Sequence, residues 1–268
     1  MGGGMHTPSC RYPRRVAAPA PFERFSGLDY EAFRRMAADP TLSSHERSGF
    51  PDALREGAEG LILVDIESKM PALGAGRELS VVDIGCGANP LTDAIIRRCR
   101  ERAHRLTLVD SPEVLAHHRG VPGLRLVEGR FPGAPFLLAD AVGTCDAVIA
   151  YSVLQVAFAE ASVHAFVDAA LTLLAPGGRL LLADPPNASM RRRFLHSAAG
   201  RAFHREYTGR DDDPPVVWAR QPLGELDDGV LFGLVARARD AGFHAWLVPQ
   251  GEGLPMANRR EDLLIARP

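Results

Sequence analysis

Between residues 79 and 184 the sequence alternates short apolar runs with longer amphipathic stretches. We predict strands at LSVVDIG (79–85), RLTLVD (105–110), LRLVEG (124–129), CDAVIAY (145–151) and GRLLLAD (178–184). The intervening helices are predicted to begin near Thr92, Glu113, Phe136 and Ser162. Apolar strands that alternate with helices are typical of a parallel sheet covered on both faces. The pattern therefore predicts a Rossmann-like, doubly wound α/β fold.

Helical and strand patterns extend on both sides of this core. Residues 28–40 have apolar positions at helical spacing up to Pro40, 41–50 reads as a loop, and 53–74 reads as further helix. After the core, 226–243 is an amphipathic helix closed by Gly242, and HAWLVPQ and EDLLIAR are two candidate strands that could pair as an antiparallel edge. The expected sheet thus has seven strands, mostly parallel, with an antiparallel edge strand and an N-terminal helical layer.

These boundaries suggest how the chain is divided. We expect a flexible arm at 1–24, because glycines and prolines there cannot sustain a helix, and a single domain at 25–268. The parts expected within the domain are an N-terminal helical lid at 25–76, a cofactor-binding core at 79–184, a substrate-side insertion at 185–225, and a C-terminal helix and strand pair at 226–268.

Composition narrows the function. A length of 268 residues suffices for one large α/β domain, and a formal charge of −2 provides no basic field for nucleic acid or a membrane surface. A small-molecule substrate is therefore expected. No apolar run reaches the roughly 18 residues of a membrane helix, so we expect a cytoplasmic protein. The four cysteines lack zinc-site spacing, and no metal site is predicted. Lys69 is the only lysine, a bias typical of GC-rich bacterial genomes.

The first predicted strand ends in VVDIGCGANP, which carries the strongest chemical signal. Gly85 and Gly87 allow a tight turn and a close approach of the backbone to a ligand, and Asp83 could accept from a ligand amine or fix the loop. Asn89 replaces the third glycine of a dinucleotide fingerprint, and Pro90 has no amide to offer a pyrophosphate. The turn therefore argues against NAD.

The second predicted strand ends in Asp110, 27 positions beyond Asp83. A carboxylate at the carboxyl end of that strand can accept hydrogen bonds from both hydroxyls of a ribose. Ligands of open α/β sheets bind at this edge, where the strand order reverses. We therefore interpret the glycine turn and Asp110 as two anchors of one cofactor pocket, with Asp110 also a candidate base.

Through VVDIGCGANP, LTLVD, CDAVIAYSVLQ and LLAPGGRLLLAD the sequence resembles the class I S-adenosylmethionine-dependent methyltransferases over roughly 79–184. The resemblance implies S-adenosylmethionine as cofactor, with its methionine portion beside Asp83, Gly85 and Gly87 and its ribose on Asp110. It also implies that Tyr151 and Ser152 line the wall beside the sulfonium. The wider predicted set of cofactor contacts adds Asn89, Ser111 and Phe131. With SSHERSGFPDALREG and LPMANRRED, the chain also resembles methyltransferase-like proteins of bacterial polysaccharide and natural-product gene clusters.

The sequence departs from the family where the adenine is recognised. Many members carry an acidic residue after the third strand, where this chain has Arg130 and Phe131, with Glu128 or Asp140 as possible substitutes. Gln155 stands where the family often has histidine. These departures keep an alternative open, in which the fold catalyses an intramolecular cyclisation or elimination, for example with loss of sulfate or phosphate, and a carboxylate such as Asp110 acts as base.

Several side chains are candidates for the substrate side. His204 and Tyr207 of the insertion, and Asp184 and Asn187 of ADPPN, are the catalytic candidates, against solvated or turn roles. Arg191, Arg192 and Arg193 could bind an anionic group or form a solvated helix face. His45, Glu46 and Arg47 could close over the pocket or cap a turn, and Cys86 reads as a packing residue.

The leading interpretation is methyl transfer to oxygen or nitrogen of a small metabolite, saccharide or natural-product intermediate. The substrate could be anionic or carrier-bound, and a partner protein of a biosynthetic complex is possible. A non-catalytic binding subunit is a third hypothesis. The sequence names neither the acceptor atom nor the oligomeric state.

Overall fold

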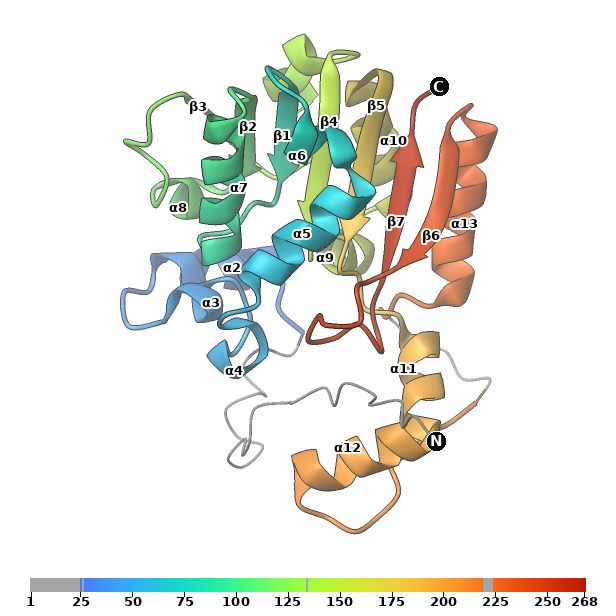
Figure 1. The fold of residues 1–268 in the computed structure, drawn as a ribbon. Coiled ribbons are helices and arrows are strands. Elements are labelled where there is room, and N and C mark those ends of the chain that lie inside the picture. Colours follow the sequence, from blue (N-terminus) through green and yellow to red (C-terminus); the bar gives the residue numbers. More distant parts are fainter. Residues whose placement is uncertain (1–24, 26, 134, 219–223) are drawn as a thin grey trace, which may run out of the picture.

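A computed structural model describes residues 25, 27–133, 135–218 and 224–268; the arm expected at 1–24 lies outside these residues. Within them, seven strands form one sheet in the order β3-β2-β1-β4-β5-β7-β6 (Figure 1). The strands are β1 Ser80–Ile84, β2 Arg105–Asp110, β3 Leu124–Glu128, β4 Cys145–Tyr151, β5 Leu174–Ala183, β6 His244–Pro249 and β7 Glu261–Ala266. All seven predicted strands are present, and most of their ends agree within about one residue.

The strands are parallel except for β7, which pairs antiparallel with both β5 and β6. The predicted mostly parallel seven-stranded sheet is confirmed, with β7 second from the edge and β6 forming it. From β1 the chain runs outward to β2 and β3 and then returns to β4 on the other side of β1. The order therefore reverses between β1 and β4, which makes their carboxyl ends the expected ligand edge.

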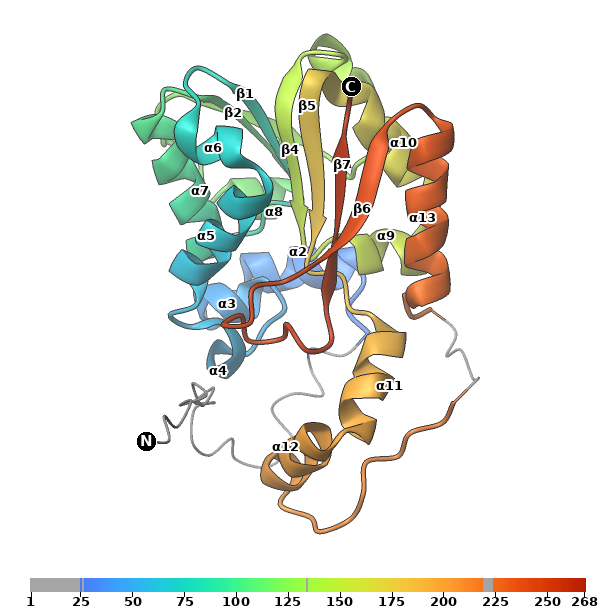
Figure 2. The ribbon, with the colours of Figure 1, turned by 45° about the vertical axis from the view of Figure 1, so that its right-hand side comes forward.

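Two apolar layers cover the sheet. On one face Val81, Leu108 and Ile149 pack with α5 Glu59–Lys69, α6 Pro71–Ala75, α7 Pro90–Glu101 and α8 Pro112–Leu115. On the other face Val82 and Val148 pack with α9 Leu154–Glu160, α10 Val163–Leu173 and α13 Asp228–Asp240 (Figure 2). Successive strand residues point to opposite faces of the sheet, so neighbours such as Val81 and Val82 lie on different faces. Both are buried because helices cover each face. A 3₁₀ helix at Pro135–Ala141 occupies the position of the helix predicted near Phe136.

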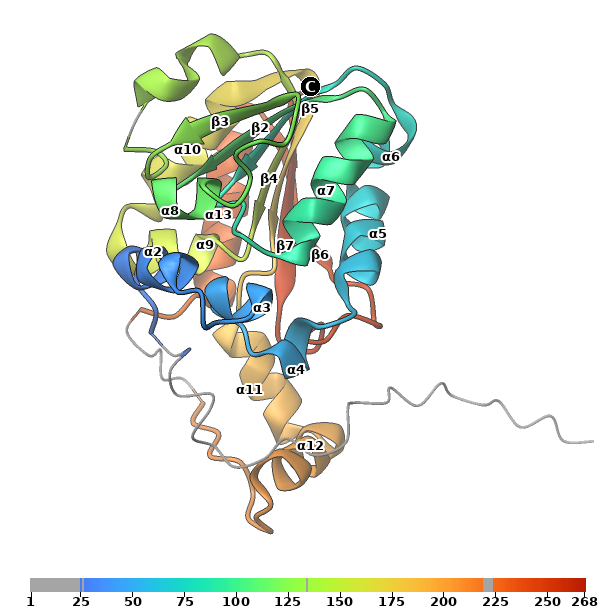
Figure 3. The same ribbon diagram turned by 90° about the vertical axis from the view of Figure 1, so that its left-hand side faces the viewer.

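The N-terminal helices α2 Tyr30–Ala38, α3 Ser44–Arg47 and α4 Asp52–Arg55 lie at the carboxyl edge of the sheet (Figure 3). The loop prediction for 41–50 is wrong at α3. A capping box explains this short helix, because Ser43 Oγ accepts from the Glu46 amide while the Glu46 carboxylate accepts from the Ser43 amide.

Residues 185–225 contain α11 Ala188–His196 and α12 Ala198–Thr208, which project from the carboxyl edge as an arm (Figure 1). Asn187 and Ser197 cap the two helices. Among the described residues, no helix combines the length and the apolar character that a bilayer crossing needs.

Candidate functional site

One cavity opens at the carboxyl edge where the strand order reverses. It contains about 1230 Å³ of free space, its open mouth included, and lies between the β1–α7 turn, the ends of β2 and β4, helix α9 and the N-terminal helices. Six aromatic side chains contribute to its wall: Tyr30, Phe33, Phe50, Phe131, Tyr151 and Phe166. A concave, mostly apolar site with a few polar groups is typical of small-molecule binding.

The glycine turn forms one side of this cavity. Gly85 and Gly87 have φ of +69° and +73°, a region that favours glycine. A Cβ at Gly85 would lie 2.6 Å from Val153 Cγ2, and one at Gly87 would lie 2.6 Å from Asn89 Nδ2. Conformation therefore favours glycine at both positions, and lack of space favours it at Gly85 as well, so both leave bare backbone at the cavity wall.

Asp110 lies directly beside this turn. Its Oδ2 accepts from the Gly87 amide at 3.0 Å, and its Oδ1 accepts from the Ser111 amide at 2.7 Å. Burial raises the pKa of Asp110, against the lowering effect of these two hydrogen bonds. The two anchors predicted from the sequence thus adjoin one another and line the same cavity.

Asp83 lies behind the turn and not on the cavity wall. Its side chain is buried, and among the described residues Oδ1 has no hydrogen-bond partner. Burial, and then the nearby Asp110, raise the pKa of Asp83 to about 7. Near neutral pH this carboxyl group is therefore partly protonated.

The other predicted cofactor contacts divide into two groups. Asn89 lines the cavity; it caps α7 through Oδ1 and donates from Nδ2 to Ser48 Oγ at 3.0 Å. Phe131 also lines it and packs edge-on against Phe166 with centroids 5.2 Å apart. Ser111 does not line the cavity, because its buried hydroxyl caps α8.

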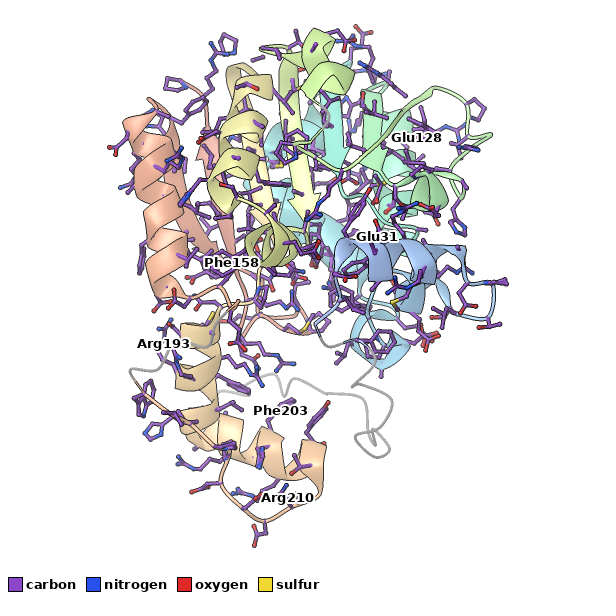
Figure 4. The ribbon with its side chains drawn as sticks, turned by 180° about the vertical axis from the view of Figure 1, so that it is seen from behind. Glu31, Glu128, Phe158, Arg193, Phe203 and Arg210 are labelled. Atoms are coloured by element: carbon purple, nitrogen blue, oxygen red, sulfur yellow. The ribbon has the colours of Figure 1, made fainter. Side chains whose placement is uncertain are left out.

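Among the described residues, the region after β3 places no acidic side chain on the cavity wall. Glu128 pairs with Arg119 and Asp140 pairs with Arg125 in exposed ion pairs, so neither suggested substitute faces the cavity. Figure 4 shows Glu128 on the outer side of the sheet. Arg130 does line the cavity, pairs with Glu160 at 2.9 Å and lies over the Tyr30 ring.

Tyr151 and Ser152 also line the cavity, and both are held by a residue that the sequence analysis missed. Arg55 of α4 donates from Nη1 to Tyr151 Oη at 3.1 Å and from Nη2 to Ser152 Oγ at 3.2 Å. The guanidinium stacks on Phe50, 4.1 Å from the ring centroid. Arg55 lies in SSHERSGFPDALREG, a segment that carries part of the family resemblance, but the sequence assigns the residue no role and only the contacts identify it.

Asp184 is a structural ion-pair partner and a poor candidate for a base. It is buried and accepts from Arg55, Arg260 and Ser152. Burial alone would raise the pKa of Asp184, but Arg260 and Arg55 bring it below its ordinary value. Gln250 donates to both Asp184 and Asp262, and Asp262 pairs with Lys69 at 2.8 Å, so the network extends to Lys69. A carboxylate held in this way has neither the pKa nor a free lone pair suited to proton abstraction.

The remaining catalytic candidates lie away from the cavity wall. Asn187 is buried and caps α11, with its amide group donating to Asp228 and Glu261. His204 contacts Asp212 at 3.2 Å, and Tyr207 stacks on Phe203, both on α12. Figure 4 shows Phe203 and Arg210 on this arm, apart from the body of the sheet. None of the three lines the cavity in this conformation.

Of the two charged clusters identified in the sequence, the arginine run at 191–193 lies outside the cavity and the cluster at 45–47 lies at its wall. In the arginine run, Arg193 pairs with Asp228 at 2.5 Å and Arg192 contacts Ser189, so the run lies on α11 outside the cavity. His45 and Arg47 do line the cavity. His45 contacts Glu59 through Nε2 at 2.6 Å and Asp52 through Nδ1 at 3.1 Å. Cys86 also lines the cavity as a buried free thiol.

No protein-family model and no curated protein sequence matches the chain. Among solved structures, it is similar to a Haloferax volcanii protein solved in complex with a methyltransferase activator, at 17% identity and a TM-score of 0.55, over 91% of this chain and 100% of that one. The plantazolicin methyltransferase BamL, solved with a desmethyl analogue and S-adenosylhomocysteine, has 15% identity and a TM-score of 0.53, over 89% and 96%. A SAM-dependent methyltransferase from Archaeoglobus fulgidus has 11% identity and a TM-score of 0.51, over 81% and 97%.

These structures share the fold of this chain over nearly their full lengths. The chain therefore has the fold of the class I S-adenosylmethionine-dependent methyltransferases.

Proposed function

We propose that this protein transfers the methyl group of S-adenosylmethionine to an oxygen or nitrogen atom of a small metabolite, such as a saccharide or a natural-product intermediate. One observation carries the proposal. The Gly87 amide donates to the Asp110 carboxylate at the reversal point of the sheet, so a bare backbone turn and a hydroxyl-binding group adjoin in one cavity.

The residues present fit this cofactor. Gly85 and Gly87 leave room for the methionine portion to lie against the backbone, and Asp110 retains lone pairs for ribose hydroxyls. Phe131 and Phe166 line the same cavity as Asp110 and offer apolar ring surfaces that suit a flat purine ring. When bound, S-adenosylmethionine supplies an electrophilic methyl group.

The chain's own contribution is to position the reactants and exclude water. Methyl transfer needs alignment of the acceptor atom with the sulfonium, and a base only when the acceptor carries a proton. The aromatic wall keeps the cavity largely apolar. Phe33 of α2, Phe50 of the loop between α3 and α4, and Arg55 of α4 all line it, which supports the proposed role of 25–76 as a lid.

The non-methylating alternative gains no support from Asp110. This carboxylate accepts two backbone hydrogen bonds, one on each oxygen, an arrangement that suits a fixed anchor better than a base that must move protons. A partner protein is a separate prediction for this chain. The Haloferax volcanii neighbour is solved with an activator protein, and we keep such a partner as a prediction here.

Calorimetric titration of the purified protein with S-adenosylmethionine and S-adenosylhomocysteine tests the proposal. We expect both to bind, and Asp110→Ala to weaken S-adenosylhomocysteine by roughly tenfold to a hundredfold, because hydrogen bonds to a charged group contribute about 1.5–3 kcal/mol. Asp140→Ala is the matched control, because Asp140 pairs with Arg125 outside the cavity. Absence of binding to both ligands by the unmodified protein would refute the proposed function.

A further inference from the structure

The Arg55 guanidinium is fixed from several directions. Besides Tyr151 and Ser152 it contacts the Asp184 carboxylate, and it stacks on the Phe50 ring. The residue is 7% exposed, so these contacts are shielded from water. A planar, always charged guanidinium suits such multiple contacts better than an ammonium group. Arg55 therefore fixes where the Tyr151 hydroxyl lies.

The two hydroxyl groups that Arg55 contacts differ in whether their own protons are already donated in a hydrogen bond. Ser152 Oγ accepts from Arg55 and donates to Asp184, so its proton is engaged. Tyr151 Oη accepts from Arg55, and this is the hydrogen bond that its hydroxyl makes among the described residues. Burial, and then Asp184, raise the pKa of Tyr151, so the hydroxyl keeps its proton at neutral pH. Tyr151 is thus a protonated phenol, and the residue lines the cavity.

We propose that the Tyr151 hydroxyl donates a hydrogen bond to the acceptor atom of the substrate, and that this atom is the oxygen of a phenolate or carboxylate. This inference rests on the proposed methyl transfer and selects between the oxygen and nitrogen acceptors left open there. A neutral amine nitrogen has a single lone pair, which must point at the methyl carbon. An anionic oxygen has three, so it can accept from Tyr151 while another pair attacks.

The step then balances without a base. One lone pair of the anionic oxygen forms the bond to the methyl carbon, the carbon–sulfur bond breaks, and its electron pair goes to sulfur. The negative charge of the acceptor and the positive charge of the sulfonium cancel, and no proton moves. Tyr151 remains protonated throughout and acts by orienting the oxygen.

The cavity wall favours a flat anion. Arg47, Arg55 and Arg130 place three guanidinium groups on the wall, but Arg55 is paired with Asp184 and Arg130 with Glu160, and Glu59 and Asp110 add carboxylates. Arg47 forms no ion pair among the described residues, so it is the guanidinium that an anionic acceptor could use. Two aromatic rings of the N-terminal segment, Phe33 on α2 and Phe50 in the loop between α3 and α4, offer faces on which an aromatic ring can pack. Together these features favour a phenolate over an alkyl carboxylate.

Two probes of equal shape test the acceptor class. The protein saturated with S-adenosylhomocysteine is titrated with 4-nitrophenolate and, separately, with 4-nitroaniline, above the pH at which the phenol ionises. We expect the phenolate to bind at least about tenfold more tightly, as a hydrogen bond to a charged group implies. Equal affinity of the two probes, or no binding of either, would overturn the inference. Failure of S-adenosylhomocysteine itself to bind would instead overturn the proposed function.

Variants then assign the preference to named atoms. At saturating S-adenosylhomocysteine, Tyr151→Phe should remove the preference for the phenolate while 4-nitroaniline binds within about twofold of its original affinity. Tyr207→Phe is the matched control, because Tyr207 lies on α12 outside the cavity wall. An unchanged preference in Tyr151→Phe, or an equal loss for both probes, would contradict a donor role.

Arg55 is a positioning residue in this scheme, and its variants give a graded readout. Arg55→Lys should keep part of the phenolate preference and Arg55→Met should lose it, because only the former retains a donor near Tyr151 Oη. In a double-variant cycle with Tyr151→Phe, the two effects should not add. Additive effects would show that Arg55 acts elsewhere. If Arg55→Met does not fold, Arg55→Lys and Tyr151→Phe still complete the test.

Discussion

The Arg34 guanidinium contacts both carboxylate oxygens of Glu113, with Nη2 to Oε1 at 2.7 Å and Nε to Oε2 at 3.0 Å. This bidentate pair joins α2 of the N-terminal segment to α8, the helix that follows Asp110. A second link lies nearby, where His117 Nε2 contacts the Ala37 carbonyl at 2.8 Å. The N-terminal helices are thus fastened to α8, the helix that follows Asp110.

We predict that Arg34→Ala accelerates the dissociation of S-adenosylhomocysteine by a few fold, because one fastening of α2 over the cavity is lost. Stopped-flow displacement measures the rate. The pair is partly exposed, so the difference from the unmodified protein should shrink at high salt. Arg98→Ala, which removes ion pairs remote from the cavity, is the control. Equal acceleration in both variants would contradict the lid role.

Gly85→Ala should destabilise the protein more than Gly177→Ala. Both residues have positive φ, +69° and +78°, so both variants pay the same conformational penalty of about 1–2 kcal/mol. Only at Gly85 does the new Cβ meet another atom, Val153 Cγ2 at 2.6 Å, whereas Gly177 has open space. Crowding should add roughly 1–3 kcal/mol. Denaturant unfolding of the two variants measures the difference, and equal losses would show that the turn relaxes freely.

Asp83 should make the protein less stable as pH rises from about 4 to about 7. Its pKa is about 7 in the folded chain and about 3.9 in an unfolded one, so the folded state binds the extra proton across this interval. The stability that the neutral carboxyl contributes is fully present below about pH 4, near the unfolded pKa. It is lost as the pH rises through the folded pKa of about 7. The loss is at most about 4 kcal/mol, from three pKa units.

Asp83→Asn removes this titration. Urea unfolding at a series of pH values, compared between the variant and the unmodified protein, isolates the effect from those of other carboxylates. We expect the stability difference to move in favour of the variant as pH rises through the interval and then to become constant. A difference that does not change with pH would mean that Asp83 ionises normally.

Cys86 should be protected from thiol reagents by S-adenosylhomocysteine. The thiol lines the cavity, while Cys99 and Cys145 are buried off its wall. Burial raises the pKa of Cys86, so a small neutral reagent such as methyl methanethiosulfonate should react slowly, and faster as pH rises. Mass spectrometry of a Cys10→Ser background follows the modification, with Cys86→Ala as control. An unchanged rate in the presence of bound ligand would place the ligand elsewhere.

Much of the fold follows from local sequence. The strand pattern and its alternation with helices are set by neighbouring residues, and so are the turn at Gly85 and Gly87 and the position of Asp110 at a strand end. Parallel strands bring their carboxyl ends to one edge, so the order of these segments was enough to predict that the turn and Asp110 would adjoin. Short helices such as α3 were missed because a capping box outweighs weak periodicity there.

Tertiary structure alone decided which side chains complete the cavity. Arg55 reaches Tyr151 across 96 positions of sequence, and Asp184, which reads as a possible base in ADPPN, is buried between two arginines. His204 and Tyr207 lie on an arm outside the cavity wall because the insertion forms helices that project from the sheet edge. Periodicity and turn chemistry act over a few residues, whereas burial and ion pairing depend on segments that meet only after folding.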